Sequence, residues 1–223
     1  MSKINSERLS GLVPGLDLRK LDNQFFNRKN VVRIARDLIG KILVTCFDKT
    51  PTAGRIVETE AYAGVEDRAS HAFGGRRTNR TEIMYQGAGT SYIYLCYGIH
   101  HLFNIVTNKE DIPHAILVRA LEPLIGIETM LARTRKKILD YSLTRGPGNL
   151  SKAMGLTTTH TGKSLFDEEI YVADDGFKPS SKQIATATRI GVDYAGPDAL
   201  LPYRFYLKEN NFVSSLVKKS SRK

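Results

Sequence analysis

Two carboxylates lie two residues apart in the segment RIVETEAY, residues 55–62. Alternate side chains of an extended strand share a face, so Glu58, Glu60 and Tyr62 are predicted to lie together. Paired carboxylates beside an aromatic ring on a rigid element suit acid–base chemistry on a planar ligand. A solvated polar face with a salt bridge to Arg55 gives the same pattern.

Three tyrosines fall within six residues, at Tyr92, Tyr94 and Tyr97. The β-prone runs 90–97 and 100–107 around Gly98 predict a hairpin-like unit. Tyr92 and Tyr94 would share a face, and Tyr97 would lie facing away or at the tip, where a ring could push between base pairs. Tyrosines that pack across strands on a sheet surface are the alternative.

Three further polar residues could read or hold a ligand. His71 can donate, accept and stack, and Asn104 on the returning strand could check the exocyclic groups of a base, although such residues are often merely exposed or bonded to backbone. Arg119 lies in an apolar strand, where a cation is costly unless it is paired. Its candidate partners are Glu58, Glu60 and a DNA phosphate.

Basic residues mark possible phosphate contacts. The loop 64–89 carries Arg68, Arg76, Arg77 and Arg80. Arg76 and Arg77 directly follow two glycines, which would let guanidinium groups and backbone amides approach phosphates. Arg145 opens a glycine-rich approach to a helix, another place where free amides bind phosphate.

The composition limits the class of protein. Lys and Arg total 33 against 23 Asp and Glu, a net charge of +10. This charge favours a polyanionic partner but is also found in basic proteins with no nucleic-acid role. Cys46 and Cys96 are too few for a disulfide scaffold, so we expect buried free thiols in a reducing cytosol, and no Cys or His spacing suggests zinc. No segment has the length of a signal peptide or a membrane span, so we expect a soluble intracellular protein.

The predicted elements indicate an α+β fold. Expected strands cover 41–47, 54–62, 90–97, 100–107, 114–121 and 204–208, with a polar turn at 48–52. Expected helices follow Asn30 up to Gly40 and cover 123–137, 149–154 and 182–189. Strict βαβ alternation, the dinucleotide-binding glycine motif and the P-loop are missing, which favours one domain with a mixed, largely antiparallel sheet. We expect an N-terminal segment 1–24 that is partly disordered or draped on the surface, a domain 25–213 and a basic tail 214–223.

Five stretches together resemble the alkyladenine (methylpurine) type of 3-methyladenine DNA glycosylase. They are RIVETEAY (55–62), SHAFGGRRTNR (70–80), YIYLCYGIHHLFN (92–104), ILVRALEP (116–123) and RGPGNLSKAMG (145–155). Their order and spacing match from about residue 25 to residue 212. The resemblance implies a single α+β domain whose curved sheet is surrounded by helices and carries a protruding β-hairpin.

The resemblance also implies residue roles. It makes Glu60 the water-activating base, with Arg119 beside it. It makes Tyr62, His71 and Tyr94 the residues that enclose a flipped base, with Asn104 disfavouring the 2-amino group of guanine. Tyr97 would intercalate into the duplex, and we expect Arg76, Arg77 and Arg145 to contact the DNA backbone.

The expected activity is hydrolysis of the N-glycosidic bond of 3-methyladenine, and possible further substrates are hypoxanthine and ethenoadenine. We expect no metal, no cofactor and no membrane partner. We expect a monomer that acts on double-stranded DNA with a damaged purine. The expected location is the cytoplasm or, in a eukaryote, the nucleus. One alternative is a damaged-DNA binding protein of the same fold. Others are a structural RNA-binding protein and a metal-dependent hydrolase using Glu58, Glu60, His71, His100 or His101, although the adjacent His100 and His101 would face opposite ways on a strand.

Overall fold

The computed structural model describes residues 18–214, and in this part of the chain nine strands form one sheet. The strands are β1 (Arg19–Lys20), β2 (Ile42–Phe47), β3 (Thr50–Tyr62), β4 (Ser91–Cys96), β5 (His100–Thr107), β6 (His114–Ile125), β7 (Ile170–Asp174), β8 (Ile184–Ala187) and β9 (Arg204–Leu207). The α-helices are α2 (Asn23–Phe26), α3 (Val31–Asp37), α4 (Ile127–Thr134) and α5 (Pro147–Met154). The short 3-10 helices are η1 (Gly64–Glu66), η2 (Phe73–Gly75), η3 (Glu82–Tyr85), η4 (Tyr141–Leu143), η5 (Thr158–His160) and η6 (Asp193–Leu200).

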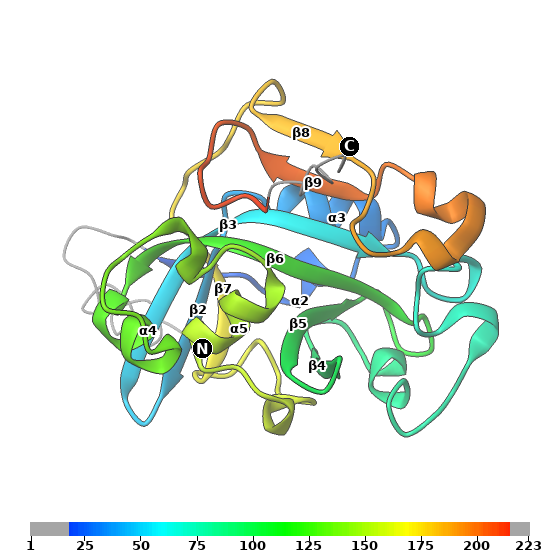
Figure 1. Cartoon of the computed structure of the whole chain (residues 1–223). Coiled ribbons are helices and arrows are strands. Elements are labelled where there is room, and N and C mark those ends of the chain that lie inside the picture. Colours follow the sequence, from blue (N-terminus) through cyan, green and yellow to red (C-terminus); the bar gives the residue numbers. More distant parts are fainter. Residues whose placement is uncertain (1–17, 215–223) are drawn as a thin grey trace.

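The sheet branches at its longest strand. Its main order is β1-β7-β2-β3-β6-β5-β4, and β9 pairs with both β3 and β8. The first half of β3 pairs with β2 and the second half pairs with β9, while β6 runs along the opposite edge of β3 (Figure 1). Every strand pair in the described residues is antiparallel, which confirms the α+β prediction.

Helices cover the sheet and close the core. The Asn30 side chain accepts from the Arg33 amide at 2.9 Å and caps α3, as predicted. Buried α3 residues such as Ile34 pack against β3, β6 and β9, while α5 packs against β5 and β6 and adjoins α4. Helix α5 begins two residues before the predicted start and ends at Gly155, whose φ is 74°. No helix in the described residues has the length and apolar composition needed to cross a membrane.

Three local predictions were wrong. Residues 182–189 contain β8 instead of a helix, because β-branched residues such as Ile184 and Thr186 suit a strand and β9 offers an edge to pair with. Pro123 lies inside β6 at a register shift, where a missing backbone N–H is tolerated, and α4 starts only after Gly126. The turn after β2 is only Asp48–Lys49, both with positive φ, as a two-residue turn of type I′ requires.

The ends and the cysteines also differ in part from expectation. Leu18 and Leu21 are buried and β1 pairs with β7, so the sheet starts inside the expected N-terminal segment. The rest of that segment (1–17) and most of the expected tail (215–223) lie outside the described residues. Cys46 and Cys96 are free thiols, but both are half-buried instead of buried.

Candidate active site

Glu58 and Glu60 share one guanidinium. Both carboxylates have no exposed surface, and Arg119 places its Nε 3.2 Å from Glu58 Oε1 and its Nη1 3.1 Å from Glu60 Oε1. The predicted common face is therefore confirmed. The alternative of a solvated face is wrong, because Arg55 pairs with Asp175 instead.

A register shift between β3 and β6 positions the triad formed by Glu58, Glu60 and Arg119. The pairing changes register on both sides of Glu58, and neither Val57 nor Arg119 has a directly paired residue in the ladder. Such bulges re-aim side chains and are frequent beside functional sites. Burial alone would lower the pKa of Arg119, but the charges of Glu60 and Glu58 raise it above its ordinary value, so the guanidinium stays charged.

Three donors hold the Glu60 carboxylate. Tyr62 donates its hydroxyl to Oε2 at 2.8 Å, and Ile190 donates its backbone N–H to Oε1 at 2.7 Å, in addition to Arg119. Burial and then the charge of Glu60 raise the pKa of Tyr62 well above its ordinary value, so the phenol remains a donor. The carboxylate is thus fixed in one orientation.

Glu58 is held from the other side of the triad. The Arg204 Nε lies 3.4 Å from Glu58 Oε1, and the backbone N–H of Ser214 donates to Oε2 at 2.7 Å. The Ser214 hydroxyl also donates to Oε2. Glu58 therefore anchors Arg119 within a buried network of ion pairs and hydrogen bonds.

Above the triad lies a cavity of about 210 Å³. It brings together most of the residues predicted from the sequence: Tyr62, His71, Tyr94, Tyr97, Asn104 and Arg119 all line it. Glu60 is not among the lining residues and lies behind Tyr62 and Arg119, which do line it. An aromatic cavity lined by Arg119, with the Glu60 carboxylate bonded behind it, suits a planar ligand.

Aromatic side chains form one wall of this cavity. The His71 and Tyr94 rings meet edge to face at 4.7 Å, and the Tyr92 and Tyr94 rings lie 5.5 Å apart. His71 Nδ1 is 2.8 Å from the Tyr92 hydroxyl. Burial, followed by the charges of Arg80 and Arg76, lowers the pKa of His71 to about 4, so its imidazole is neutral at physiological pH.

The β4–β5 hairpin carries the remaining predicted residues. Tyr97 lies in its turn with a φ of 50° and is 92% exposed, although it also lines the cavity. The buried Asn104 donates its amide to the carbonyl groups of Tyr92 and Leu102 at 3.2 and 3.1 Å. Asn104 therefore satisfies backbone groups and borders the cavity at the same time.

The predicted backbone-contacting arginines occupy different environments. Arg76 is exposed, whereas Arg77 is bonded to Glu82 and Asp111. Arg145 donates to the carbonyl of Asn211 and lines a second hollow that also contains Tyr97. The structure thus brings Arg145 to the base of the hairpin turn but does not place Arg77 in the cavity.

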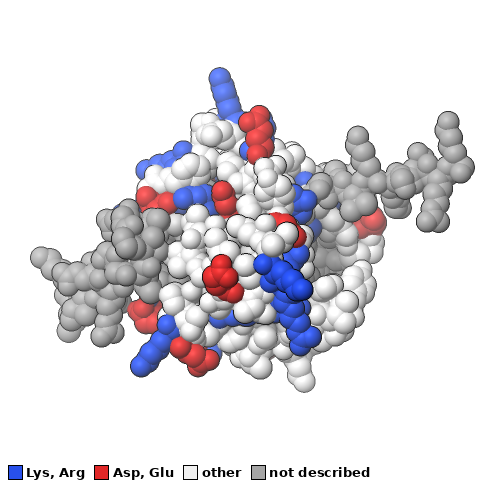
Figure 2. All heavy atoms as spheres, turned by 60° about the vertical axis from the view of Figure 1, so that its left-hand side comes forward, with Lys and Arg blue, Asp and Glu red and all other residues white. Residues whose placement is uncertain are grey.

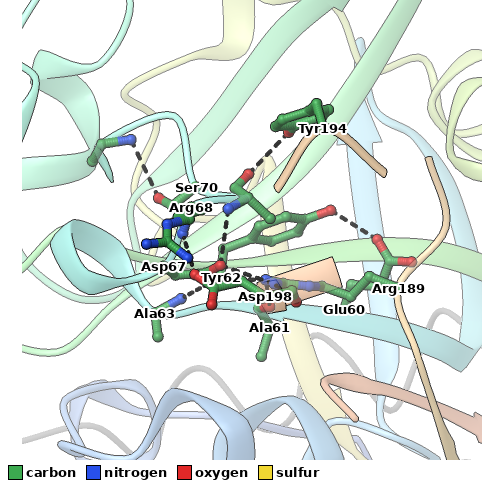
Figure 3. Close-up of polar contacts among 12 residues, drawn as sticks. Glu60, Ala61, Tyr62, Ala63, Asp67, Arg68, Ser70, Arg189, Tyr194 and Asp198 are labelled. Atoms are coloured by element: carbon green, nitrogen blue, oxygen red, sulfur yellow. Dashed lines mark hydrogen bonds and ion pairs between the residues drawn. The ribbon is translucent and has the colours of Figure 1, made fainter. Parts of the chain in front are cut away.

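Sequence reasoning missed a buried ion pair that joins two walls of the site. Arg189 forms a two-pronged ion pair with Asp67, and its Nη1 also donates to the carbonyl of Ala61 at 2.9 Å (Figure 3). Asp67 in turn accepts from the backbone amides of Ala63 and Ala69. The pair ties the loop after β3 to the segment that supplies the Ile190 amide. No motif marked it, because Arg189 and Asp67 are 122 residues apart.

Tyr194 was also missed. It is 70% exposed at the rim of the cavity, and its hydroxyl donates to the carbonyl of Ala69 at 3.1 Å (Figure 3). It adds a second contact between the same two segments.

On the face formed by α4 and the β2–β3 hairpin, positive charge is mixed with negative charge (Figure 2). Figure 2 shows the side formed by α4 and the β2–β3 hairpin, where basic and acidic side chains lie next to one another. In the described residues, no group of three or more His, Cys, Asp or Glu side chains is arranged to hold a metal ion.

Comparison with known proteins matches this chain to one family. A family model described as methylpurine-DNA glycosylase (MPG) matches residues 24–211. A protein of Desulfitobacterium hafniense (strain Y51) is 41% identical over 204 residues, which cover 88% of this chain and 99% of the relative. Proteins of Natranaerobius thermophilus and Bdellovibrio bacteriovorus are 44% and 45% identical, over 87% and 86% of this chain and 98% and 97% of their own. All three carry the name "Putative 3-methyladenine DNA glycosylase". The chain belongs to the methylpurine-DNA glycosylase family.

Proposed function

We propose that this protein is a monofunctional DNA glycosylase that removes 3-methyladenine, and also hypoxanthine and ethenoadenine, from double-stranded DNA. The observation that carries the proposal is the aromatic cavity with the buried Glu60–Arg119 pair at its base. Family membership supports the same reaction. The proposal includes a monomer that acts in the compartment that holds the DNA, the cytoplasm in a bacterium.

The enclosed cavity requires the target nucleotide to leave the duplex. A base cannot reach Tyr62 or Arg119 while it is stacked, so the nucleotide must rotate outward. Tyr97 stands exposed at the hairpin turn and also borders the cavity, so its ring can fill the gap left in the stack. Arg76 and Arg145 would hold the backbone on either side, and Arg77 would have to give up its acidic partners to do so.

Aromatic residues would then hold the extruded base. Tyr62, His71 and Tyr94 all line the cavity, and stacking on such rings contributes about 1–3 kcal/mol per base. Asn104 borders the cavity with its amide fixed by two carbonyl groups, so it cannot turn away from a larger purine. This rigidity would disfavour the 2-amino group of guanine.

Glu60 would act as the general base. A carboxylate has about four lone-pair directions. Ile190 and Arg119 bond Oε1 and Tyr62 bonds Oε2, so one direction of Oε2 has no donor. Because the carboxylate has no exposed surface, Tyr62 would have to shift before a water molecule could bond there. Glu60 takes the proton of this water as its oxygen attacks C1′ of the sugar, and the C1′–N bond breaks with its electron pair leaving on the base. The negative carboxylate also stabilises the positive charge that develops on the sugar.

Water is the nucleophile in this proposal. None of the described residues that line the cavity is a lysine, so this part of the chain offers no amine there for a Schiff base with the sugar. The product is an abasic site in an intact strand.

The test uses duplex oligonucleotides that each carry one lesion: 3-methyladenine, hypoxanthine or ethenoadenine. The protein is incubated with each duplex in EDTA, and half of each sample is then treated with hot alkali. Strand breaks that appear only after alkali, and only at the lesion, support the proposal. Breaks without alkali would indicate a lyase. Tight lesion binding without breaks would instead favour a damaged-DNA binding protein of the same fold.

A further inference from the structure

Arg80 lies outside the base cavity but contacts two residues of its wall. Its Nη2 is 3.2 Å from His71 Nε2, and its guanidinium carbon lies 4.7 Å from the centre of the Tyr94 ring. Arg80 does not line the base cavity and instead lines a separate hollow that shares Tyr92 and Tyr94 with it. Tyr94 therefore separates the base cavity from a cation.

The contact with Arg80 fixes the tautomer of His71. A guanidinium has only donors, so His71 Nε2 must accept and carries no proton. The single proton of the neutral ring is then on Nδ1, which donates to the Tyr92 hydroxyl 2.8 Å away. Burial and the charges of Arg80 and Arg76 lower the pKa of His71, which agrees with a neutral ring.

The same contact changes the electrostatics of the Tyr94 ring. The face of an aromatic ring attracts a cation through its quadrupole. With a guanidinium already over the ring, a second cation near Tyr94 draws on the same electrons and is also repelled by the first charge. A neutral base does not suffer this repulsion.

We infer that Arg80 is a specificity-determining residue that disfavours cationic bases relative to neutral ones, acting through Tyr94 and His71 from outside the cavity. The inference rests on the proposed glycosylase function. It assigns the cavity a substrate preference that its lining residues alone do not show, because stacked tyrosines by themselves favour cations.

The test compares Arg80→Met with Arg33→Met, which removes the same charge from an exposed position on α3. Single-turnover excision is measured with the cationic 3-methyladenine, released from methylated duplex, and with the neutral hypoxanthine. The rate ratio of cationic to neutral base should rise about two- to fivefold in Arg80→Met, the factor of one cation–π contact, and stay unchanged in Arg33→Met. An unchanged ratio in Arg80→Met would overturn the inference.

A second readout does not depend on activity. In protein labelled with ¹⁵N-histidine, the ring nitrogen shifts of His71 report its tautomer and its titration. Wild-type and Arg33→Met protein should show the proton on Nδ1, whereas Arg80→Met should show mixed tautomers and a pKa closer to 6.5. An unchanged His71 signal would overturn its part in the inference. If the wild type excises neither base while His71 responds as expected, it is the proposed function that has failed.

Discussion

The guanidinium of Arg119 stands 3.1 Å from the Glu60 carboxylate and also pairs with Glu58. The guanidinium therefore lies between two acidic side chains that have no exposed surface. Buried carboxylates repel and resist ionisation unless a cation compensates them. Arg119 thus has a structural and an electrostatic role, and the two can be separated experimentally.

Arg119→Met should destabilise the protein strongly. The substitution leaves both carboxylates buried without their shared cation, and breaking a buried ion pair in this way costs about 3–5 kcal/mol. With Arg119 gone, Arg204 is left as the cation beside two carboxylates, and adding Glu58→Gln removes one of these negative charges, so the double variant should be more stable than Arg119→Met alone. Urea unfolding measures both values, with Arg33→Met as a surface control. A double variant no more stable than Arg119→Met would contradict the expectation that the Glu58 charge destabilises the protein once Arg119 is removed.

Glu60→Gln should abolish excision and preserve lesion binding. The amide keeps the shape of the side chain but accepts protons poorly, and loss of a general base typically costs about 10²–10⁴-fold in rate. Single-turnover excision and the Kd for lesion duplex are measured in parallel, with the exposed Glu110→Gln as the control. Excision at the wild-type rate would mean that another group activates the water.

The sequence allowed the carboxylate face and the β4–β5 hairpin to be predicted, whereas the residues expected around a base came from the family resemblance. These features rest on local patterns: alternation along a strand places Glu58 with Glu60, and Gly98 after a β-prone run ends β4. Sequence also restricted the partners of Arg119 to acidic groups, because an unpaired buried cation is too costly.

Other features depend on contacts between distant segments, which local patterns do not encode. The register shift beside Glu58 arises from the pairing of β3 with β6. The Ile190 amide reaches Glu60 from 130 residues away in the sequence. Residues 182–189 became a strand because β9 offered an open edge, so a tertiary contact decided the local structure.

Asp67→Asn should weaken both folding and excision. Asp67 accepts two bonds from Arg189 and two backbone amides, and the neutral amide leaves Arg189 buried without a counter-charge. We expect a loss of about 3–5 kcal/mol in unfolding free energy. Excision should also slow, because Ile190 follows Arg189 directly and holds Glu60. The matched control is Asp193→Asn, an exposed carboxylate in the same segment. Wild-type stability and excision rate in Asp67→Asn would show that the Asp67–Arg189 ion pair does not hold the Ile190 amide against Glu60.

Tyr97→Ala should reduce excision from duplex DNA without changing stability. The side chain is 92% exposed, so its removal should change the unfolding free energy by no more than about 0.5 kcal/mol. Its proposed task, filling the stack, exists only in a duplex. The rate should therefore fall much more for a lesion in duplex than for the same lesion in a single strand, whereas the exposed Leu200→Ala should affect neither. An equal loss on both substrates would place Tyr97 in base binding instead.

His71→Gln should make folding less sensitive to acid. The pKa of His71 is about 4 in the folded chain against 6.5 in the unfolded chain, because of burial and then the charges of Arg80 and Arg76. Between these values the unfolded chain binds a proton that the folded chain does not. The contribution of His71 is therefore fully present above pH 6.5 and is lost as the pH falls toward 4. In this window His71→Gln should reduce the pH slope of the unfolding free energy by up to about 1.4 kcal/mol per pH unit, the slope of one proton. Arg80→Met should reduce it by less, because burial and Arg76 remain. Urea unfolding at several pH values measures these slopes, and a slope in His71→Gln equal to that of the wild type would show that His71 titrates alike in both states.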